Sequence, residues 1–359
     1  MEEKLHLKGL NGIRAIAAVS VVLSHVGLPG IKLPYVLSIG GLAQYGVTIF
    51  FTLSGFLITY LLFKEKEQTA ISIRKFYIRR ILRIWPLYFA YLFIVIIIMV
   101  FTDRSTLSPL LPWYLFFAAN LPAILHTYIP FVSHYWTLGV EEQFYIFWPW
   151  VIKKTSNVLK ALIIFTACFF ALKFFFRFIY FKWGYIAPLH VLWVNRFECM
   201  SLGGIAAVLC IRGHRLFLQI ATHRITDTIC WIGLAIMCMN KFYITPLLDH
   251  DFAALVAIGL IVNQCFNKRP LINLENRFFD LLGKLSYGMY IIHPLIIFYY
   301  YSLLNYFKMG DITKTIVIYA GSLLLTVAVA WLSYTFFEKK FLLMKDRFTT
   351  IKNSDSTFI

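Results

Sequence analysis

Apolar residues follow one another in long runs along most of this chain, and short polar segments separate the runs. A run of about 20 apolar residues is long enough, as an α-helix, to span the hydrocarbon core of a bilayer. The pattern therefore predicts an all-α, polytopic membrane protein with about ten transmembrane helices. The expected helices cover residues 10–28, 41–63, 84–102, 138–152, 158–178, 196–212, 225–242, 252–266, 281–303 and 315–336.

One further apolar stretch, residues 109–125, is interrupted by Pro109, Pro112 and Pro122. Proline removes a backbone donor and clashes with the preceding helical turn, so a straight spanning helix is not expected here. We interpret this stretch as a re-entrant or interfacial segment.

The polar insertions between the predicted helices are short, so we expect no large domain outside the membrane. The expected organisation is a transmembrane domain over residues 1–341 and a cytoplasmic tail over residues 342–359. Whatever the protein does must then take place within the helical bundle or at its two faces.

The composition agrees with this organisation, because 60% of the residues are hydrophobic and only 14% are charged, which excludes an ordinary soluble domain. The six cysteines lie mostly within apolar runs and form no CxxC pair. We therefore expect neither a disulfide nor a structural metal site.

The net charge of +17 is typical of proteins that bind nucleic acid, but the placement of the basic residues indicates a different cause. Most of the Lys and Arg residues fall in connections that share one side of the membrane, including the stretch from Lys64 to Arg83 and the segment after Lys339. Cytoplasmic connections carry this excess. We expect both termini in the cytoplasm, the plasma (inner) membrane as the location, and no nucleic-acid partner. The oligomeric state is left open.

Arg14 and His25 interrupt the first apolar run. At about 100° and 1.5 Å per residue, the eleven steps between them return to nearly the same helix face and rise about 16 Å. Burying such groups in a bilayer costs several kcal/mol, so they usually face a polar cavity and mark a functional site. The alternative is that Arg14 extends to the headgroups and His25 bonds a neighbouring helix. The functional interpretation makes His25 a general base with Arg14 as its electrostatic partner.

A basic run precedes the third predicted helix, and Arg80 and Arg83 within it are spaced i and i+3 on one face. Two guanidinium groups so placed can hold a diphosphate through paired hydrogen bonds. The alternative is a topogenic basic run, which is the preferred interpretation for Arg79 alone.

Glu141 and Glu142 lie near the start of a predicted apolar helix. A favourable interaction of their carboxylates with the helix dipole is one explanation for their position. Glu141, however, lies on the side that continues through Tyr145 and Trp148. A carboxylate that faces a cavity can orient His25 or bind sugar hydroxyls.

Five weaker candidates for substrate binding also have ordinary explanations, because small residues commonly pack helices in membranes and amides commonly lie at the interface. Ser54 lacks a Gly-x-Ser-x-Gly frame and is not assigned as a nucleophile. Glu338, beside two lysines, is interpreted as ordinary surface charge. The five candidates are Trp136, Ser54, Asn120, Tyr287 and His293.

Taken together, these segments resemble the acyltransferase-3 family of integral-membrane acyltransferases, which includes O-antigen and other surface-polysaccharide O-acetylases. Two departures are mild: Thr137 stands where the family usually has serine, and Lys340 where proline often follows. The matching segments run in the family's order: Leu10–Ala15 with His25, Phe50–Leu57, Arg79–Pro86, Trp136–Tyr145, Ser286–Tyr290 with His293, and Phe337–Lys339.

The resemblance implies transfer of an acyl group, expected to be acetyl, from acyl-coenzyme A to a hydroxyl of a cell-surface or lipid-linked glycan. No permanently bound cofactor is implied. Arg80 and Arg83 are then expected to hold the coenzyme's phosphates. His25 serves as general base or, less simply, carries the acyl group, while Arg14 stabilises the oxyanion or orients the thioester.

Two other classes of function are considered. A transporter or flippase would use the intramembrane Arg, His and Glu as a substrate or proton path, but it predicts two related halves, which the sequence does not show. A receptor or scaffold without chemistry leaves the buried ionisable residues unexplained.

Overall fold

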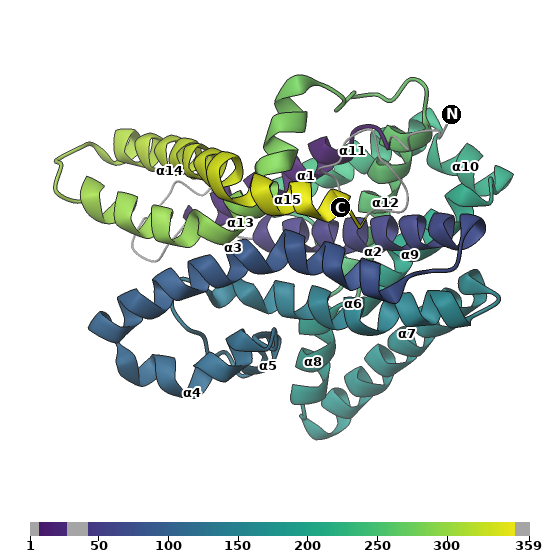
Figure 1. Ribbon diagram of the computed structural model, residues 1–359, viewed down its shortest axis with the longest axis horizontal. Helices are drawn as coiled ribbons and strands as arrows, with labels where there is room; N and C mark the ends of the chain where they lie inside the picture. The colour runs from purple at the N-terminus through teal and green to yellow at the C-terminus, as the bar shows by residue number, and fades with distance from the viewer. Residues whose placement is uncertain (1–6, 27–41, 349–359) are drawn as a thin grey trace.

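The computed structural model describes residues 7–26 and 42–348, and in these residues every regular element is helical (Figure 1). Helices α2, α3 and α6 run roughly side by side, while α8 runs across them. The α-helices are α1 (Leu10–Val26), α2 (Leu42–Gln68), α3 (Ile73–Thr102), α4 (Arg104–Leu115), α5 (Asn120–Ile124), α6 (Trp136–Lys154), α7 (Val158–Trp183), α8 (Ala187–Asn195), α9 (Phe197–Ile211), α10 (Arg215–Ala221), α11 (Arg224–Cys238), α12 (Asp249–Phe266), α13 (Arg277–Leu304), α14 (Asp311–Ser333) and α15 (Lys339–Asp346). A 3₁₀ turn, η2 (Ser133–Tyr135), precedes α6, and a π-helical turn, η3 (Tyr334–Glu338), joins α14 to α15.

Within the described residues, each of the ten predicted segments overlaps a helix, but α3 begins at Ile73 rather than at residue 84. Ser72 caps this helix, because its hydroxyl accepts a hydrogen bond from the Lys75 amide at 3.4 Å. The basic run is therefore part of α3, and its side chains are fixed to a rigid element. A hydropathy pattern does not show where this helix begins, because the charged residues of its first turns favour a helix but are as polar as a connecting segment.

The proline-interrupted stretch, residues 109–125, folds as α4 and α5, with Pro109 and Pro112 inside α4. Three further short helices, α8, α10 and α15, were not predicted, because so few residues give little periodicity. The expected boundary between residues 341 and 342 falls inside α15. Residues 349–359 of the expected tail lie outside the described residues.

The protein is a multi-pass membrane protein. Within the described residues, six helical segments are long and apolar enough to cross a membrane, and α1, with 17 residues, is a shorter apolar helix. The count of about ten crossings stays a prediction. The six segments are Leu42–Gln68, Ile73–Thr102, Val158–Trp183, Ala187–Ile211, Arg277–Leu304 and Asp311–Asp346.

Helix α2 is the central element, and it packs most extensively against α9. Gly55 on α2 lies against the backbone of Met200, and Gly203 on α9 lies against the Thr52 carbonyl. Small residues let two helix backbones approach this closely, which is how helices gain packing energy where lipid removes the hydrophobic driving force. Helix α1 packs against α2 and α13, so it too is held inside the bundle.

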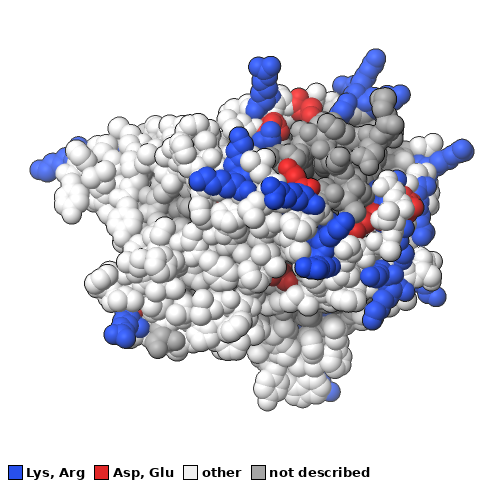
Figure 2. All heavy atoms as spheres, viewed as in Figure 1, with Lys and Arg blue, Asp and Glu red and all other residues white. Residues whose placement is uncertain are grey.

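Lysine and arginine side chains gather on one part of the face in Figure 2, over α15, α10 and the α2–α3 connection, whereas much of the opposite half is uncharged. Helix α7 exposes large apolar side chains such as Phe174, Phe178 and Phe181. Exposed apolar area of this kind is expected where a helix faces lipid.

The close α2–α9 approach predicts that Gly55→Val destabilises the protein, because its side chain would meet the Met200 backbone rather than a movable side-chain end. We expect the free energy of unfolding to fall by about 3 kcal/mol or more, which is at or above the upper end of the usual cost of overpacking. Thermal unfolding of the detergent-purified protein measures this change. Gly310→Ala is the control, because nothing lies within 4 Å of its added carbon. Equal melting temperatures for the two variants would contradict this packing account.

Candidate active site

A cavity lies within the bundle where α1, α2, α3, α6 and α13 meet. Arg14 enters from α1 and Glu141 from α6, so two helices far apart in sequence bring opposite charges to one space. The polar residues that line the cavity are Arg14, Ser54, Arg80, Arg83, Thr137, Glu141, Tyr145, Ser286, Tyr287 and Tyr290.

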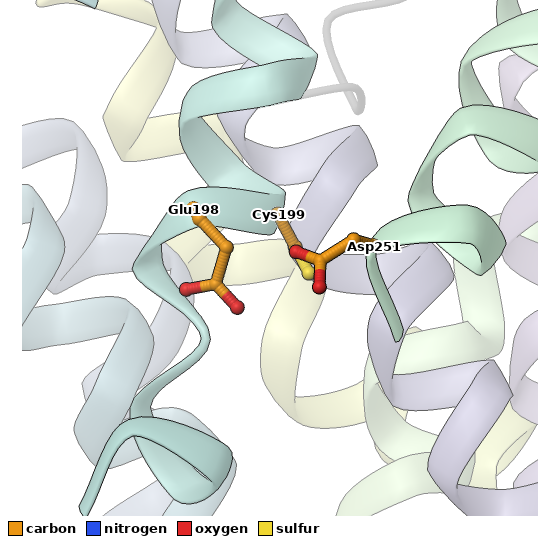
Figure 3. Close-up of side chains that lie close together, drawn as sticks. All are labelled: Glu198, Cys199 and Asp251. Atoms are coloured by element: carbon orange, nitrogen blue, oxygen red, sulfur yellow. The ribbon is translucent and has the colours of Figure 1, made fainter. Parts of the chain in front are cut away.

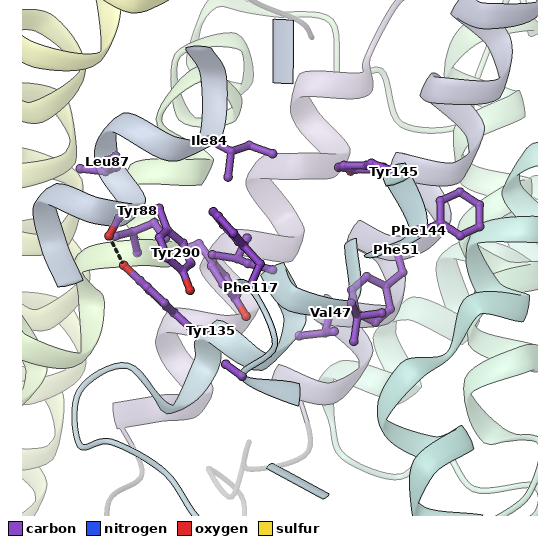
Figure 4. Close-up of a cluster of buried hydrophobic side chains, with 14 of the residues drawn as sticks. Val47, Phe51, Ile84, Leu87, Tyr88, Phe117, Tyr135, Phe144, Tyr145 and Tyr290 are labelled. Atoms are coloured by element: carbon purple, nitrogen blue, oxygen red, sulfur yellow. Dashed lines mark hydrogen bonds between the residues drawn. The ribbon is translucent and has the colours of Figure 1, made fainter. Parts of the chain in front are cut away.

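The apolar wall of the cavity comes from the same helices (Figure 4). Val47 and Phe51 on α2 and Ile84 on α3 line it directly. Behind them, the Tyr135 hydroxyl donates a hydrogen bond to the Tyr88 carbonyl at 2.9 Å. This packing fixes the angle at which α3 and α6 present their polar side chains.

Glu141 is held by two hydroxyl groups. Ser54 donates to its Oε1 at 2.8 Å, and Tyr145, one turn further along α6, donates to its Oε2 at 3.3 Å. These two contacts fix the position of the carboxyl group. The structure therefore joins Glu141 to α2 and places it in the cavity with Arg14, Arg80 and Arg83. The two roles predicted for it, orienting His25 or binding sugar hydroxyls, stay predictions.

Two arginines of the basic run face the cavity and a third does not. The Arg80 guanidinium lies 4.9 Å from the centre of the Tyr145 ring and 5.5 Å from that of Phe76, so cation–π contacts orient it. Arg83, one turn further on, lines the cavity as well. Arg79 instead forms an ion pair with Glu65 at 3.3 Å. The expected pairing of Arg80 with Arg83 on one face is present.

His25 lies three turns beyond Arg14 on α1 and is not among the residues that line this cavity. Its Nδ1 lies 2.8 Å from the Val21 carbonyl oxygen, which can only accept. Nδ1 therefore carries the proton, and Nε2 keeps the lone pair that a general base needs.

Three histidines cluster at this end of the bundle. The rings of His25 and His293 are 4.8 Å apart, and those of His293 and His134 are 5.1 Å apart. The Nδ1 of His293 lies 2.8 Å from the Tyr290 carbonyl oxygen, so its Nε2 is also the lone-pair nitrogen. His134 is buried and was not proposed from the sequence.

Tyr290 connects the cavity to the histidine cluster. Its hydroxyl lies 2.6 Å from the Thr137 hydroxyl and 3.1 Å from the His134 carbonyl oxygen, and its ring lies 5.2 Å from that of His134. This role was not predicted from the sequence, because the contacts of Tyr290 with Thr137 and His134 form only when α13 packs beside η2 and the start of α6.

The remaining candidates separate into two groups. Ser54 and Tyr287 line the cavity, and the Tyr287 hydroxyl also donates to the Ile84 carbonyl at 2.6 Å. Trp136 lies outside it, with the Arg196 guanidinium 5.6 Å from its ring. Asn120 is buried, and its amide bonds Asn195 at 2.9 Å and Gln143 at 3.0 Å. Its contacts are therefore those of a packing amide.

The expectation that Glu338 is ordinary surface charge is wrong. The residue is buried at the end of η3, where its Oε1 accepts a hydrogen bond from Ser333 at 2.9 Å. It also lies against Gly288 of α13. Single π turns of this kind often occur at functional positions, and a sequence pattern with helical period does not reveal them.

A second buried group of charges lies between α7, α9 and α12, away from the cavity. Figure 3 shows Glu198, Cys199 and Asp251, whose potential metal ligand atoms lie within 4.8 Å of one another. The Lys173 ammonium, however, lies 2.6 Å from Glu198 and 2.7 Å from Asp251. It occupies the position that a cation would take, so this group ties three helices together by ion pairs.

A profile described as "Acyltransferase domain" matches residues 7–335. The O-acetyltransferase OatA of Staphylococcus aureus (strain NCTC 8325 / PS 47) is 27% identical over 374 residues, which cover 93% of this chain and 57% of that protein. The chain thus spans little more than half the length of this relative. No solved structure matches.

Two further relatives are similar over shorter regions. The peptidoglycan O-acetyltransferase OatA of Listeria monocytogenes is 31% identical over 156 residues, which cover 40% of this chain and 24% of that protein. A putative peptidoglycan O-acetyltransferase, YrhL of Bacillus subtilis, is 32% identical over 168 residues, which cover 44% and 25%.

Proposed function

The chain belongs to the acyltransferase domain family, and from this membership we propose that it is a membrane-bound O-acyltransferase. The proposed reaction moves an acetyl group from acetyl-coenzyme A to a hydroxyl of a cell-surface or lipid-linked glycan. The relatives are named O-acetyltransferases, and two of the names specify peptidoglycan, which supports both the group transferred and the class of acceptor. One observation carries the proposal: a single helix, α1, contributes Arg14 to a basic cavity and His25 to a histidine cluster.

The donor is assigned to the basic cavity. Arg80 and Arg83 would bind the phosphates of the coenzyme, because guanidinium groups pair with phosphate oxygens through two parallel hydrogen bonds. The pantetheine arm then extends along α1 toward His25. The rise of α1 between Arg14 and His25, about 16 Å, matches the reach of such an arm.

The chemical step is assigned to His25. Its Nε2 takes the proton of the acceptor hydroxyl while the hydroxyl oxygen attacks the thioester carbonyl. The tetrahedral intermediate then expels the coenzyme A thiolate, which receives the proton from the His25 imidazolium, so that the residue returns to its starting state. Arg14 and His25 are separated by about 16 Å along the axis of α1, and we therefore assign Arg14 to orienting the donor rather than to the oxyanion.

The orientation in the membrane follows from the charge. The basic side chains gather on the part of the molecule that holds α10 and the α2–α3 connection (Figure 2), which supports a cytoplasmic location for this end. We propose that the protein lies in the plasma (inner) membrane with both termini in the cytoplasm. The donor cavity would then receive acetyl-coenzyme A from the cytoplasmic pool.

His25→Asn should lower acetyl transfer by about 100-fold or more, because the amide can still donate to the Val21 carbonyl but is not a base. Turnover is measured as acetylated glycan formed by membranes that contain equal amounts of protein. The control is His214→Asn, an exposed helix cap that asparagine also supports. A His25→Asn protein that is folded and keeps more than a tenth of wild-type turnover would refute the base assignment.

Arg83→Lys should weaken the binding of coenzyme A by about tenfold, because lysine keeps the charge but lacks the paired donors of a guanidinium. Calorimetry on the detergent-purified protein measures the dissociation constant. Arg74→Lys, an exposed position on the same helix, provides the control. Unchanged binding of coenzyme A in the Arg83 variant would contradict this assignment and would indicate that the basic run serves only to set the topology.

The proposed orientation predicts how introduced cysteines react with a membrane-impermeant thiol reagent. A cysteine at Gln68, the last residue of α2, should be labelled only after the membrane is broken. A cysteine at Ser105, at the start of α4, should be labelled in intact spheroplasts. The reversed pattern would place the basic cavity on the side without acetyl-coenzyme A and would rule out the assigned donor.

A further inference from the structure

The basic cavity ends one helical turn short of the histidine cluster. Thr137 of α6 lines the cavity, whereas His134, three residues earlier in η2, does not. On α13, Tyr290 lines the cavity, whereas His293, three residues later, does not. The hydroxyl groups of Thr137 and Tyr290 lie 2.6 Å apart and join the two helices at this end. A donor arm that extends from the cavity to His25 therefore reaches this pair of hydroxyl groups first.

Tyr290 has contacts on both sides of this boundary. Its ring lies 6.1 Å from that of Phe50, which lines the cavity. It lies 5.2 Å from the ring of His134 and 6.0 Å from that of His293, which in turn is 4.8 Å from the ring of His25. Tyr290 is only 6% exposed, so a hydrogen bond from its hydroxyl forms in a medium of low dielectric, where it is strengthened.

The hydroxyl hydrogen of Tyr290 can be redirected to a ligand. Thr137 donates to the His134 carbonyl oxygen at 3.0 Å, a local contact between η2 and the start of α6. With the Thr137 hydrogen used in this way, the Tyr290 hydrogen is the one that lies between the two hydroxyl groups. A carbonyl oxygen of a ligand can then replace the Thr137 oxygen as its acceptor, because Thr137 stays bonded through its own hydrogen.

The proposed transfer needs a donor at this place. Attack on the thioester carbonyl puts negative charge on its oxygen, and preorganised hydrogen-bond donors are the usual means of stabilising such an oxyanion. Arg14 is separated from His25 by about 16 Å along α1 and is assigned to orienting the donor. The apolar side chains of Val47 and Phe50, which also line the cavity, cannot supply a hydrogen bond.

We propose that Tyr290 is a further catalytic residue, whose hydroxyl donates a hydrogen bond to the thioester carbonyl oxygen of the donor. This inference rests on the proposed function, since it takes acetyl-coenzyme A as the donor. When the acceptor oxygen bonds to the carbonyl carbon, the electron pair of the C=O π bond moves onto the oxygen, and Tyr290 stabilises it while keeping its own proton. The C=O double bond re-forms as the C–S bond breaks, and the thiolate takes the proton held by His25.

The test compares the affinity of the full chain in detergent for acetyl-coenzyme A and for S-ethyl-coenzyme A, a thioether that lacks the carbonyl oxygen. The ratio of the two dissociation constants isolates the carbonyl contact. We expect Tyr290→Phe, which keeps the ring, to lower the preference for acetyl-coenzyme A about fivefold relative to wild type. Tyr300→Phe is the control, because this hydroxyl on the same helix donates to the Val317 carbonyl at 3.3 Å, and its ratio should stay within twofold of wild type. A wild-type ratio in Tyr290→Phe would overturn the proposal.

Turnover provides a second measurement. Tyr290→Phe should lower the rate of acetyl transfer about 100-fold, while its dissociation constant for coenzyme A, which has no thioester, stays within twofold of wild type. A Tyr290→Phe protein that is folded by thermal unfolding and transfers acetyl groups at the wild-type rate would also overturn the proposal.

Thr137→Val identifies which hydroxyl group meets the carbonyl, and it replaces Tyr290→Phe if that variant fails to fold. It removes the other hydroxyl of the pair, so the preference for acetyl-coenzyme A should be kept. A preference that is lost in Thr137→Val would assign the carbonyl contact to Thr137 and overturn the proposal. Failure of the wild-type chain to bind either compound or coenzyme A would instead remove the proposed donor itself, together with the inference that depends on it.

Discussion

The cost of placing a guanidinium inside a membrane protein governs the arrangement of this bundle. Arg14 lies in the second turn of an apolar helix, and such a group needs polar or oppositely charged neighbours because lipid offers none. These neighbours come from three other helices: Ser54 from α2, Glu141 from α6 and Tyr287 from α13. The close packing of α2 on α9 and of α1 on α13 is what brings them within reach. The polar residues of the cavity therefore accommodate the buried charge of Arg14 as well as leaving space for a ligand.

The same constraint separates the site into two ends. Helix α1 is uninterrupted between Arg14 and His25, so it holds the basic cavity and the histidine cluster apart. Tyr290 connects the two places. A donor with a charged nucleotide and a long uncharged arm suits such a division, because its phosphates and its thioester need different surroundings. His134 and His293 lie with His25 at the other end.

Sequence reasoning predicted the helical class, the ten long helical segments and the residues on one face of one helix. Arg80 and Arg83, which both line the cavity, are found because helical spacing is local, whereas Arg14 and His25, predicted on one helix face, contribute to two different places. Contacts that depend on packing between helices, such as the hydrogen bond from Ser54 to Glu141, could not be predicted in this way. The prediction for Glu338 failed, because this residue looks like surface charge beside two lysines and is buried at the end of η3. The number of membrane crossings and their direction remain predictions from charge and length.

The central claim is that this bundle transfers an acyl group between two substrates. The most direct measurement is the release of free coenzyme A from acetyl-coenzyme A by the purified chain in liposomes, with and without a cell-wall glycan fraction as acceptor. The account predicts release that depends on the acceptor and equals the acetyl ester formed on it. Uptake of either compound into the liposomes without release of coenzyme A would contradict the account and would indicate a transporter.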